Sequence, residues 1–173
     1  CKMTIFLFPT ELEASDFREL CPDAEIVVSG VGMAETASTI ARINQVYDLS
    51  QSVVILSGIA GAYDGRCNIG DVVEVVSEVV SELPVRFRRS YVVEAYTRQR
   101  LVKSNCVSGC GAECCDADIE NMEGATLFAM AETMGFRAVE IRAISNFVGD
   151  DFSKWSIELA VNNLAKTLVK YAK

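Results

Sequence analysis

The chemistry open to this chain is narrowed by its composition, because none of its 173 residues is histidine. Catalytic arrangements of the Ser-His-Asp and Cys-His kinds are thereby excluded. Any chemistry must rest on carboxylates, amides, hydroxyls, arginine or lysine. One group of carboxylates stands in residues 118–132, DIENMEGATLFAMAE, where Asp118, Glu120 and Glu123 surround Met122 directly ahead of an apolar, helix-like run.

A second interpretation of these three carboxylates involves no chemistry. Acidic side chains in the first turn of a helix are stabilised by the unpaired backbone N–H groups and by the helix dipole. Taken alone, the segment therefore fits a capping role as well as a functional one. The choice between the two depends on the rest of the chain.

The cysteines raise the question of a metal site or a disulfide. The segment CVSGCGAECC places Cys106, Cys110, Cys114 and Cys115 close together, within a total of seven cysteines. Their spacing is not the paired C-x2-C of a zinc site, no histidine is available, and an odd total in a cytosolic chain is typical of reduced thiols. The sequence therefore predicts no metal and no cofactor.

The length, apolar content and net charge of the chain limit the class of protein and the partners that it can bind. A chain of this length that is 50% apolar can form one domain over residues 1–173 with a substantial core. Its formal charge of −8 argues against binding to nucleic acid or to anionic membranes. No apolar run approaches the roughly 20 residues that span a bilayer, and residues 1–15 lack the pattern of a signal peptide. We therefore expect a cytoplasmic protein.

The apolar pattern predicts alternating strands and helices. Buried strands are expected in MTIFLF, AEIVVSGVG, SVVILSGIAGAY, DVVEVVSEVV and RAVEIRAISNFV, and helices at 34–47, 122–134 and 153–172. Strands that are apolar almost throughout must be covered on both faces. The prediction is an α/β fold with three layers, in which a central, parallel or mixed sheet is flanked by helices.

The segments that follow the strands are where a ligand is expected, because ligands of open α/β folds lie outside the carboxyl ends of the strands. These segments are PTELEAS, SGVGMAET, SGIAGAY and ISNFVGDD. Residues 81–118 are harder to assign. Their arginines 86, 88 and 89 fit a solvated loop better than a patch that faces the substrate.

Taken together, these segments resemble the nucleoside phosphorylase and nucleosidase superfamily over nearly the whole chain. SGVGMAET is similar to the family's Gly-x-Gly turn, SGIAGAY with NIGDVVEV to its Gly-x-Ala-Gly loop and Gly-Asp-Val-Val, and ENMEGA to its Met-Glu ribose motif. DIENMEGA and EIRAISNFVGDD are most similar to the futalosine hydrolases of the alternative menaquinone pathway. The resemblance implies a nucleosidase fold, a nucleoside substrate and a homodimer.

The resemblance also implies roles for single residues. Glu123 would hold the ribose 2′- and 3′-hydroxyls, since a carboxylate accepts two hydrogen bonds and favours a cationic sugar in the transition state. Met122 would pack against the sugar, while Glu120 and Asp118 would cap and solubilise the helix. Glu13 matches the carboxylate that activates water, and Glu11 is the second choice. The glycine loop contributes Ile59, Ala60 and Gly61.

Asn146 matches the residue that contacts the base, where adenosine-type nucleosidases carry aspartate. An asparagine amide can donate to O6 or N7 of hypoxanthine, so it favours a 6-oxopurine; a role as a turn or helix-start residue is the alternative. Ser145 would orient the amide, and Arg142 would be a structural partner. The residues expected near the purine are Asn105, Cys106 and Val107.

The choice between hydrolase and phosphorylase rests on arginine, which phosphorylases use to bind phosphate. Family phosphorylases carry one just before the glycine loop, but SVVILSGIAG has no positive charge. Water is therefore the expected nucleophile, with Glu13 as its base. Alternatives are a methylthioadenosine/S-adenosylhomocysteine nucleosidase, a purine nucleoside phosphorylase, and a nucleoside-binding sensor without turnover.

Overall fold

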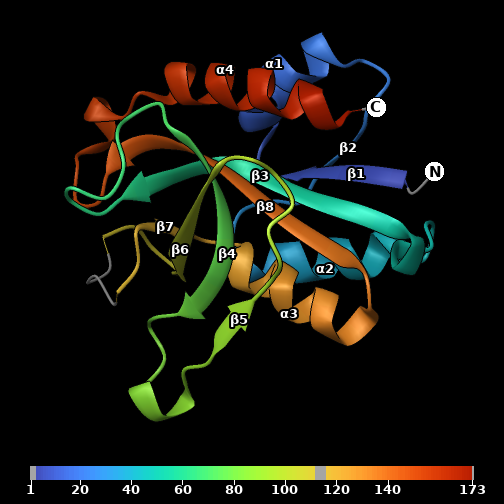
Figure 1. Cartoon of the computed structure of the whole chain (residues 1–173), viewed down its shortest axis with the longest axis horizontal. Coiled ribbons are helices and arrows are strands. Elements are labelled where there is room, and N and C mark those ends of the chain that lie inside the picture. Colours follow the sequence, from blue (N-terminus) through green and yellow to red (C-terminus); the bar gives the residue numbers. More distant parts are fainter. Residues whose placement is uncertain (1–2, 112–115, 173) are drawn as a thin grey trace.

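A mixed sheet forms the centre of the molecule, with helices on both of its faces (Figure 1). The computed structural model describes residues 3–111 and 116–172. In that part the strands are β1 Met3–Phe8, β2 Glu25–Val28, β3 Ser52–Ala62, β4 Val72–Val80, β5 Ser90–Val92, β6 Arg100–Cys106, β7 Ile119–Asn121 and β8 Arg137–Phe147. The helices are α1 Glu11–Leu20, α2 Met33–Ile43, α3 Gly124–Met134 and α4 Ile157–Leu168, with short 3-10 turns η1 Leu49–Gln51, η2 Val85–Phe87, η3 Phe152–Lys154 and η4 Val169–Tyr171.

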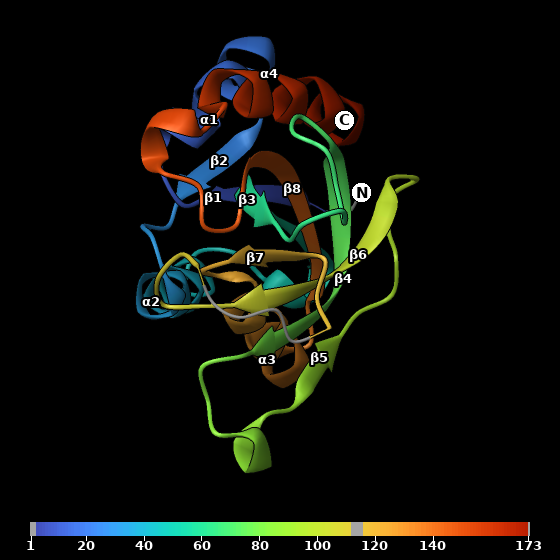
Figure 2. The ribbon, with the colours of Figure 1, turned by 90° about the vertical axis from the view of Figure 1, so that its left-hand side faces the viewer.

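The sheet closes partly on itself. Its order is β2-β1-β3-β7-β6-β4-β5, and β8 pairs with both β3 and β4. Two routes therefore connect β3 with β4, one through β8 and the other through β7 and β6, and the five strands form a ring (Figure 2). The pairs β1–β3, β3–β8 and β4–β6 are parallel, while β3–β7 and β4–β8 are antiparallel.

Two apolar cores fill the space between the sheet and its helices. Alternation along β1 sends Phe6 and Phe8 toward α1 and α4, and Ile5 and Leu7 toward α2 and α3. The helix pairs lie on opposite sides of the sheet (Figure 1). The predicted three-layer α/β fold with a mixed sheet is confirmed.

Differences from the predicted elements fall in the polar parts of the chain. Each predicted strand and helix is present, although the helices are shorter than expected. Helix α1 and strands β5 to β7 were not predicted. Helix α1 is mostly polar and buries only Glu13, Ala14 and Phe17, while β6, RLVKSNC, carries charged and amide side chains. Within the described residues, the longest helices fall short of the length and apolar content that a bilayer span requires.

Candidate active site

A cavity of about 320 Å³ opens at the carboxyl ends of β1, β3 and β8. This volume is within the usual range for small-molecule sites. The location is the one expected for an α/β fold, and it brings together residues from all four segments that follow the predicted strands. The described residues that line it are Pro9, Thr10, Leu12, Glu13, Val31, Ile59, Ala60, Gly61, Val107, Cys110, Glu120, Asn121, Met122, Glu123, Ser145, Asn146, Phe152, Trp155 and Ile157.

Glu13 is held by two hydrogen bonds on the wall of this cavity. Thr10, the N-cap of α1, donates from its hydroxyl to Oε2 of Glu13 at 2.6 Å, and the backbone N–H of Ile59 donates to Oε1 at 2.9 Å. The side chain is 6% exposed. Glu11 is not among the described residues that line the cavity and pairs with Arg18 at the surface, so Glu13 is the one of these two carboxylates that lies at the cavity.

The pKa of Glu13 is raised above its ordinary value, first because burial penalises the charged form. The hydrogen bonds from Thr10 and Ile59 and the charge of Arg142 oppose this rise, while the charge of Glu123 adds to it. A carboxylate with a raised pKa is a stronger base than an ordinary glutamate. Glu13 is thus suited to accept a proton.

Glu123 lies at the start of α3, yet its side chain does not cap the helix. Its Oε1 accepts from the backbone N–H of Gly32 at 2.9 Å, and its Oε2 accepts from Nη2 of Arg142 at 3.1 Å. The cap comes instead from Oδ1 of Asn121, which accepts from the N–H groups of Glu123 and Gly124. The capping interpretation is wrong for Glu123, and a carboxylate that is not used by the helix faces the cavity.

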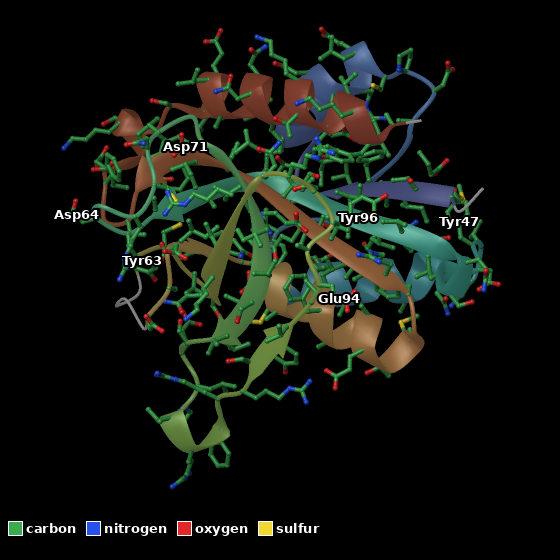
Figure 3. All side chains as sticks on the ribbon, in the orientation of Figure 1. Tyr47, Tyr63, Asp64, Asp71, Glu94 and Tyr96 are labelled. Atoms are coloured by element: carbon green, nitrogen blue, oxygen red, sulfur yellow. The ribbon has the colours of Figure 1, made fainter. Side chains whose placement is uncertain are left out.

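The capping and solubilising roles predicted for Glu120 and Asp118 are also wrong. Glu120 is 4% exposed on β7, lines the cavity, and accepts from the hydroxyl of Tyr63 and the backbone N–H of Gly111. Tyr63 follows β3 directly (Figure 3). Asp118 accepts from the backbone N–H of Lys103 and so ties the segment before β7 to β6. Asp118 directly precedes strand β7 and Glu120 lies within it, so neither is in a helical first turn.

Ser145 and Asn146 both line the cavity because β8 has a bulge there. Neighbouring residues of a strand normally point to opposite faces. Here Ala60 pairs with Ile144 and Gly61 with Asn146, so Ser145 is an extra residue in β8. Its hydroxyl donates to Oδ1 of Asn146 at 2.7 Å. This contact is the one expected of a side chain that orients the amide.

Three residues stand side by side across the sheet at the inner wall. Gly61 of β3 pairs with Glu120 of β7 on one side and with Asn146 of β8 on the other. A Cβ atom at Gly61 would lie 3.1 Å from Nδ2 of Asn146. The missing side chain leaves a slot between a carboxylate and an amide. A flat ring with both donors and acceptors on its edge can enter such a slot.

The residues predicted near the purine divide between two environments. Val107 lines the cavity, as do Ile59, Ala60 and Met122. Asn105 and Cys106 do not: Asn105 donates to the hydroxyl of Tyr63, and Cys106 is fully buried, which raises the pKa of its thiol. Both belong to β6, whose end at Cys106 leaves Val107 as the first residue free to turn toward the cavity.

Several lining residues were missed by the sequence analysis. Thr10 could have been found, because Thr10 and Glu13 have the spacing of a capping box. Phe152 and Trp155, whose ring centroids are 5.1 Å apart, supply aromatic surface from η3 and the residue after it. Leu12 and Val31 gave no signal, since single apolar residues in loops and surface helices are common.

The remaining chemical groups singled out in the sequence are the arginine cluster, which lies at the surface, and the cysteine cluster, of which one member reaches the cavity. Arg86 and Arg89 stack on Phe87 and Tyr91, and the arginine segment forms a surface arm, as the loop interpretation predicted. Among the four clustered cysteines, Cys106 is buried and Cys110 is exposed at the cavity. Cys114 and Cys115 lie outside the described residues.

Arg142 is the centre of a buried polar network beneath the cavity. It is 1% exposed, and its Nη2 donates to Glu123 and, at 3.0 Å, to Asn121. Its Nε donates to Glu140 at 2.8 Å. Burial lowers the pKa of Arg142, but the charges of Glu140 and Glu123 outweigh that effect and raise it. The structural role predicted for Arg142 agrees with these contacts, because every one of them holds another side chain or backbone group in place.

Gly124, the first residue of α3, is expected to tolerate no side chain. A Cβ atom there would overlap carboxylate oxygens of both Glu140 and Glu78, which are fully buried and cannot retreat. Gly124→Ala should therefore lower the free energy of unfolding by about 3 kcal/mol, the upper part of the usual cost of overpacking. Denaturant unfolding measures the change. Gly109→Ala is the control, since no described atom lies within 4 Å of a Cβ there, and an equal loss in both variants would contradict the account.

The fold is that of nucleoside phosphorylases and nucleosidases. The chain superposes on 5′-methylthioadenosine/S-adenosylhomocysteine nucleosidase from Helicobacter pylori with a TM-score of 0.83, covering 97% of each chain at 14% identity. It superposes on a futalosine hydrolase mutant of the same species with a TM-score of 0.81 at 12% identity, covering 98% of this chain and 97% of the other. The resemblance seen in the sequence is confirmed at the level of the fold.

Two sequence comparisons agree with the fold. Residues 112–173 match the family model of the Phosphorylase superfamily. Futalosine hydrolase of Thermus thermophilus is 27% identical to this chain over 96% of the chain and 93% of its own length. The interpretation of the chain as a nucleosidase-type enzyme is confirmed at that general level.

Proposed function

We propose that this chain hydrolyses the N-glycosidic bond of a 6-oxopurine nucleoside, and that futalosine is its substrate. One observation carries the proposal: a single cavity combines a buried basic carboxylate, Glu13, a second carboxylate, Glu123, and an amide, Asn146. These are the groups needed to activate water, hold a ribose and bind a purine. The T. thermophilus relative, a futalosine hydrolase, supports the choice of substrate.

In the proposed reaction Glu13 is the base. Water in the cavity gives a proton to Glu13 as its oxygen bonds to the anomeric carbon of the ribose, and the bond from that carbon to N9 of the purine breaks. Gly58 permits this arrangement, because a Cβ there would lie 2.7 Å from both Oε1 of Glu13 and Nη1 of Arg142. The base leaves with the electron pair of the broken bond and takes a proton from solvent.

Glu123 is proposed to hold the ribose. Its carboxylate is fixed by Gly32 and Arg142, and it accepts hydrogen bonds from the 2′- and 3′-hydroxyls through its remaining lone pairs. Its negative charge stabilises the positive charge that develops on the sugar as the bond to the base breaks. Met122, which also lines the cavity, offers an apolar surface to the sugar.

Asn146 and Glu120 are proposed to contact the base from the two sides of the Gly61 slot. One N–H of the Asn146 amide donates to the backbone oxygen of Phe147, which leaves the second for O6 or N7 of the purine. Hypoxanthine also has an N1–H group, and a carboxylate such as Glu120 can accept a hydrogen bond from it. Adenine presents a bare N1 acceptor instead. The pairing therefore favours a 6-oxopurine, and it separates this chain from the methylthioadenosine nucleosidases that share its fold.

Water, rather than phosphate, is the proposed nucleophile. The described part of the cavity wall contains three carboxylates and neither lysine nor arginine. Arg142 lies behind Glu123 and donates to Glu140, Glu123 and Asn121. A phosphate dianion would meet negative charge without a bidentate partner, which is costly in a buried site.

Base release should therefore be independent of phosphate. We expect equal initial rates with and without inorganic phosphate, and free sugar rather than a sugar 1-phosphate as the second product. The measurement is chromatography of both products after incubation with futalosine. A strict requirement for phosphate, with a 1-phosphate as product, would show that the chain is a phosphorylase.

We further propose that the protein is a cytoplasmic homodimer. The arm formed by residues 83–92, which contains η2 and β5, projects from the body of the chain (Figure 1). It exposes Leu83, Val85, Phe87 and Val92. Clustered exposed apolar side chains mark an interaction surface. Light scattering in solution tests the assembly, and the mass of a single chain would contradict it.

A further inference from the structure

Two fully buried carboxyl groups lie beneath the active site and take no direct part in the proposed reaction. Glu78 of β4 and Glu140 of β8 are each 0% exposed, and their carboxyl groups lie within hydrogen-bonding reach of each other. They meet against Gly124, whose missing side chain gives them room. Two neighbouring carboxyl groups that are both buried cannot both be ionised without strong repulsion.

The hydrogen-bond partners of the four oxygens of Glu78 and Glu140 indicate how many protons the two carboxyl groups hold. Oε1 of Glu78 accepts from Asn121, and Oε1 of Glu140 accepts from Arg142. The second oxygens, Oε2 of Glu78 and Oε2 of Glu140, are buried and lack a donor among the described residues. If one of the two carboxyl groups carries a proton, its O–H can donate to the ionised oxygen of the other. Both oxygens then have a partner, and the repulsion between two negative charges is removed.

The surroundings decide which carboxyl group carries this proton. Glu140 lies beside the guanidinium of Arg142, which favours the ionised form. Glu78 is surrounded by the neutral groups of Asn121, Ser104 and Cys106. Burial raises the pKa of Glu78, and the charge of Glu140 raises it further. The other charged groups that face the pair are Glu123 and Arg142.

We propose that Glu78 and Glu140 share one proton, carried by Glu78, and act as a positioning pair for Glu123. Glu140 fixes Arg142, whose Nη2 holds Oε2 of Glu123. Glu78 fixes the amide of Asn121, whose oxygen holds the backbone N–H of Glu123. The orientation of the ribose-binding carboxylate thus depends on two residues that never touch the substrate. This part of the inference rests on the proposed function, whereas the shared proton does not.

Unfolding at different pH values tests the proton without any substrate. The folded chain keeps a proton on Glu78 that the unfolded chain releases above the ordinary glutamate pKa, so the stability that this proton contributes is lost as pH rises toward the folded pKa. In that window the unfolding constant of the wild type should rise up to about tenfold per pH unit relative to Glu78→Gln. A ratio that does not change with pH would overturn the shared proton.

Kinetics test the positioning. Glu140→Gln and Glu78→Leu should each lower kcat/KM about 10²-fold, the usual effect of a small misplacement at an active site. Glu78→Gln should restore most of the loss, because glutamine can donate to Glu140 and accept from Asn121 as the neutral acid does. The control is Glu74→Gln on the same strand, where the buried carboxylate binds Tyr96 and Thr97 and kcat/KM should not change.

Three outcomes of these kinetics would count against the positioning pair. They are full activity in Glu140→Gln, an equal loss in Glu78→Gln and Glu78→Leu, and an equal loss in the Glu74→Gln control. If the wild type released no base from any nucleoside, the proposed function would fail, and the comparison of unfolding constants would still decide whether the proton is shared.

Discussion

Glu13→Gln is expected to lower turnover of the nucleoside by about 10²- to 10⁴-fold, the usual range for removing a general base. The amide oxygen of glutamine can still accept from the N–H of Ile59, and its NH2 group can donate to the hydroxyl oxygen of Thr10, so the fold and substrate binding should be retained. What is lost is the ability to take a proton from water. Steady-state kinetics with a binding measurement on the same variant separates the two effects.

The pH dependence gives a second signature of Glu13. Burial raises the pKa of Glu13. In the wild type, kcat/KM should therefore fall as pH is lowered, and the midpoint of this fall should lie above the pH at which an ordinary glutamate titrates. The fall should be absent from the residual activity of Glu13→Gln. Glu11→Gln is the control, and it should behave as the wild type. Near-normal turnover in Glu13→Gln would assign the base to another group.

Asn146→Asp is expected to shift the preference of the enzyme from 6-oxopurine toward 6-aminopurine nucleosides. An ionised aspartate offers only acceptors to O6 and N7, which are acceptors themselves, and each buried polar group left unpaired costs about 1 to 3 kcal/mol. Toward adenine the same carboxylate can accept from the 6-amino group. Discrimination built on buried hydrogen bonds can reach about 10⁴-fold.

The measurement for Asn146→Asp is kcat/KM for matched 6-oxo and 6-amino nucleosides with the same 5′ group, in wild type and variant. Glu120 should limit the size of the shift, since its carboxylate remains opposite N1 in both proteins. Asn146→Leu serves as a control that removes the amide without supplying a carboxylate, and it should weaken both substrates. An unchanged ratio in a folded Asn146→Asp protein would mean that Asn146 does not select the base.

The parts of the fold that could be predicted are those whose sequence carries a clear period. Strand β3 is apolar over most of its length, and β8 has apolar residues on both of its faces, so the burial of both strands could be predicted directly. Helix α4 has an apolar stripe and was also found. Strand β6 was not, because its buried positions hold Ser104 and Asn105, which bond within the polar interior rather than pack in an apolar core.

The residues of the candidate site likewise fall into those that the sequence could predict and those that it could not. Glu13, Glu123 and Asn146 were identified through motifs, and the structure brings all three to one cavity. The position of Glu120 could not be predicted, because it depends on the short strand β7 and on its pairing with β3. Nor could the sequence indicate that the cap of α3 comes from Asn121, since Glu123 occupies the position from which helices are usually capped.

The most direct test of the proposed function is a comparison of substrates with the wild-type protein in phosphate-free buffer. Futalosine, inosine and methylthioadenosine are incubated separately, and the released bases are resolved by chromatography. The account predicts that hypoxanthine appears, fastest from futalosine, and that little adenine is formed from methylthioadenosine. Rapid release of adenine, with hypoxanthine absent from both other reactions, would contradict it.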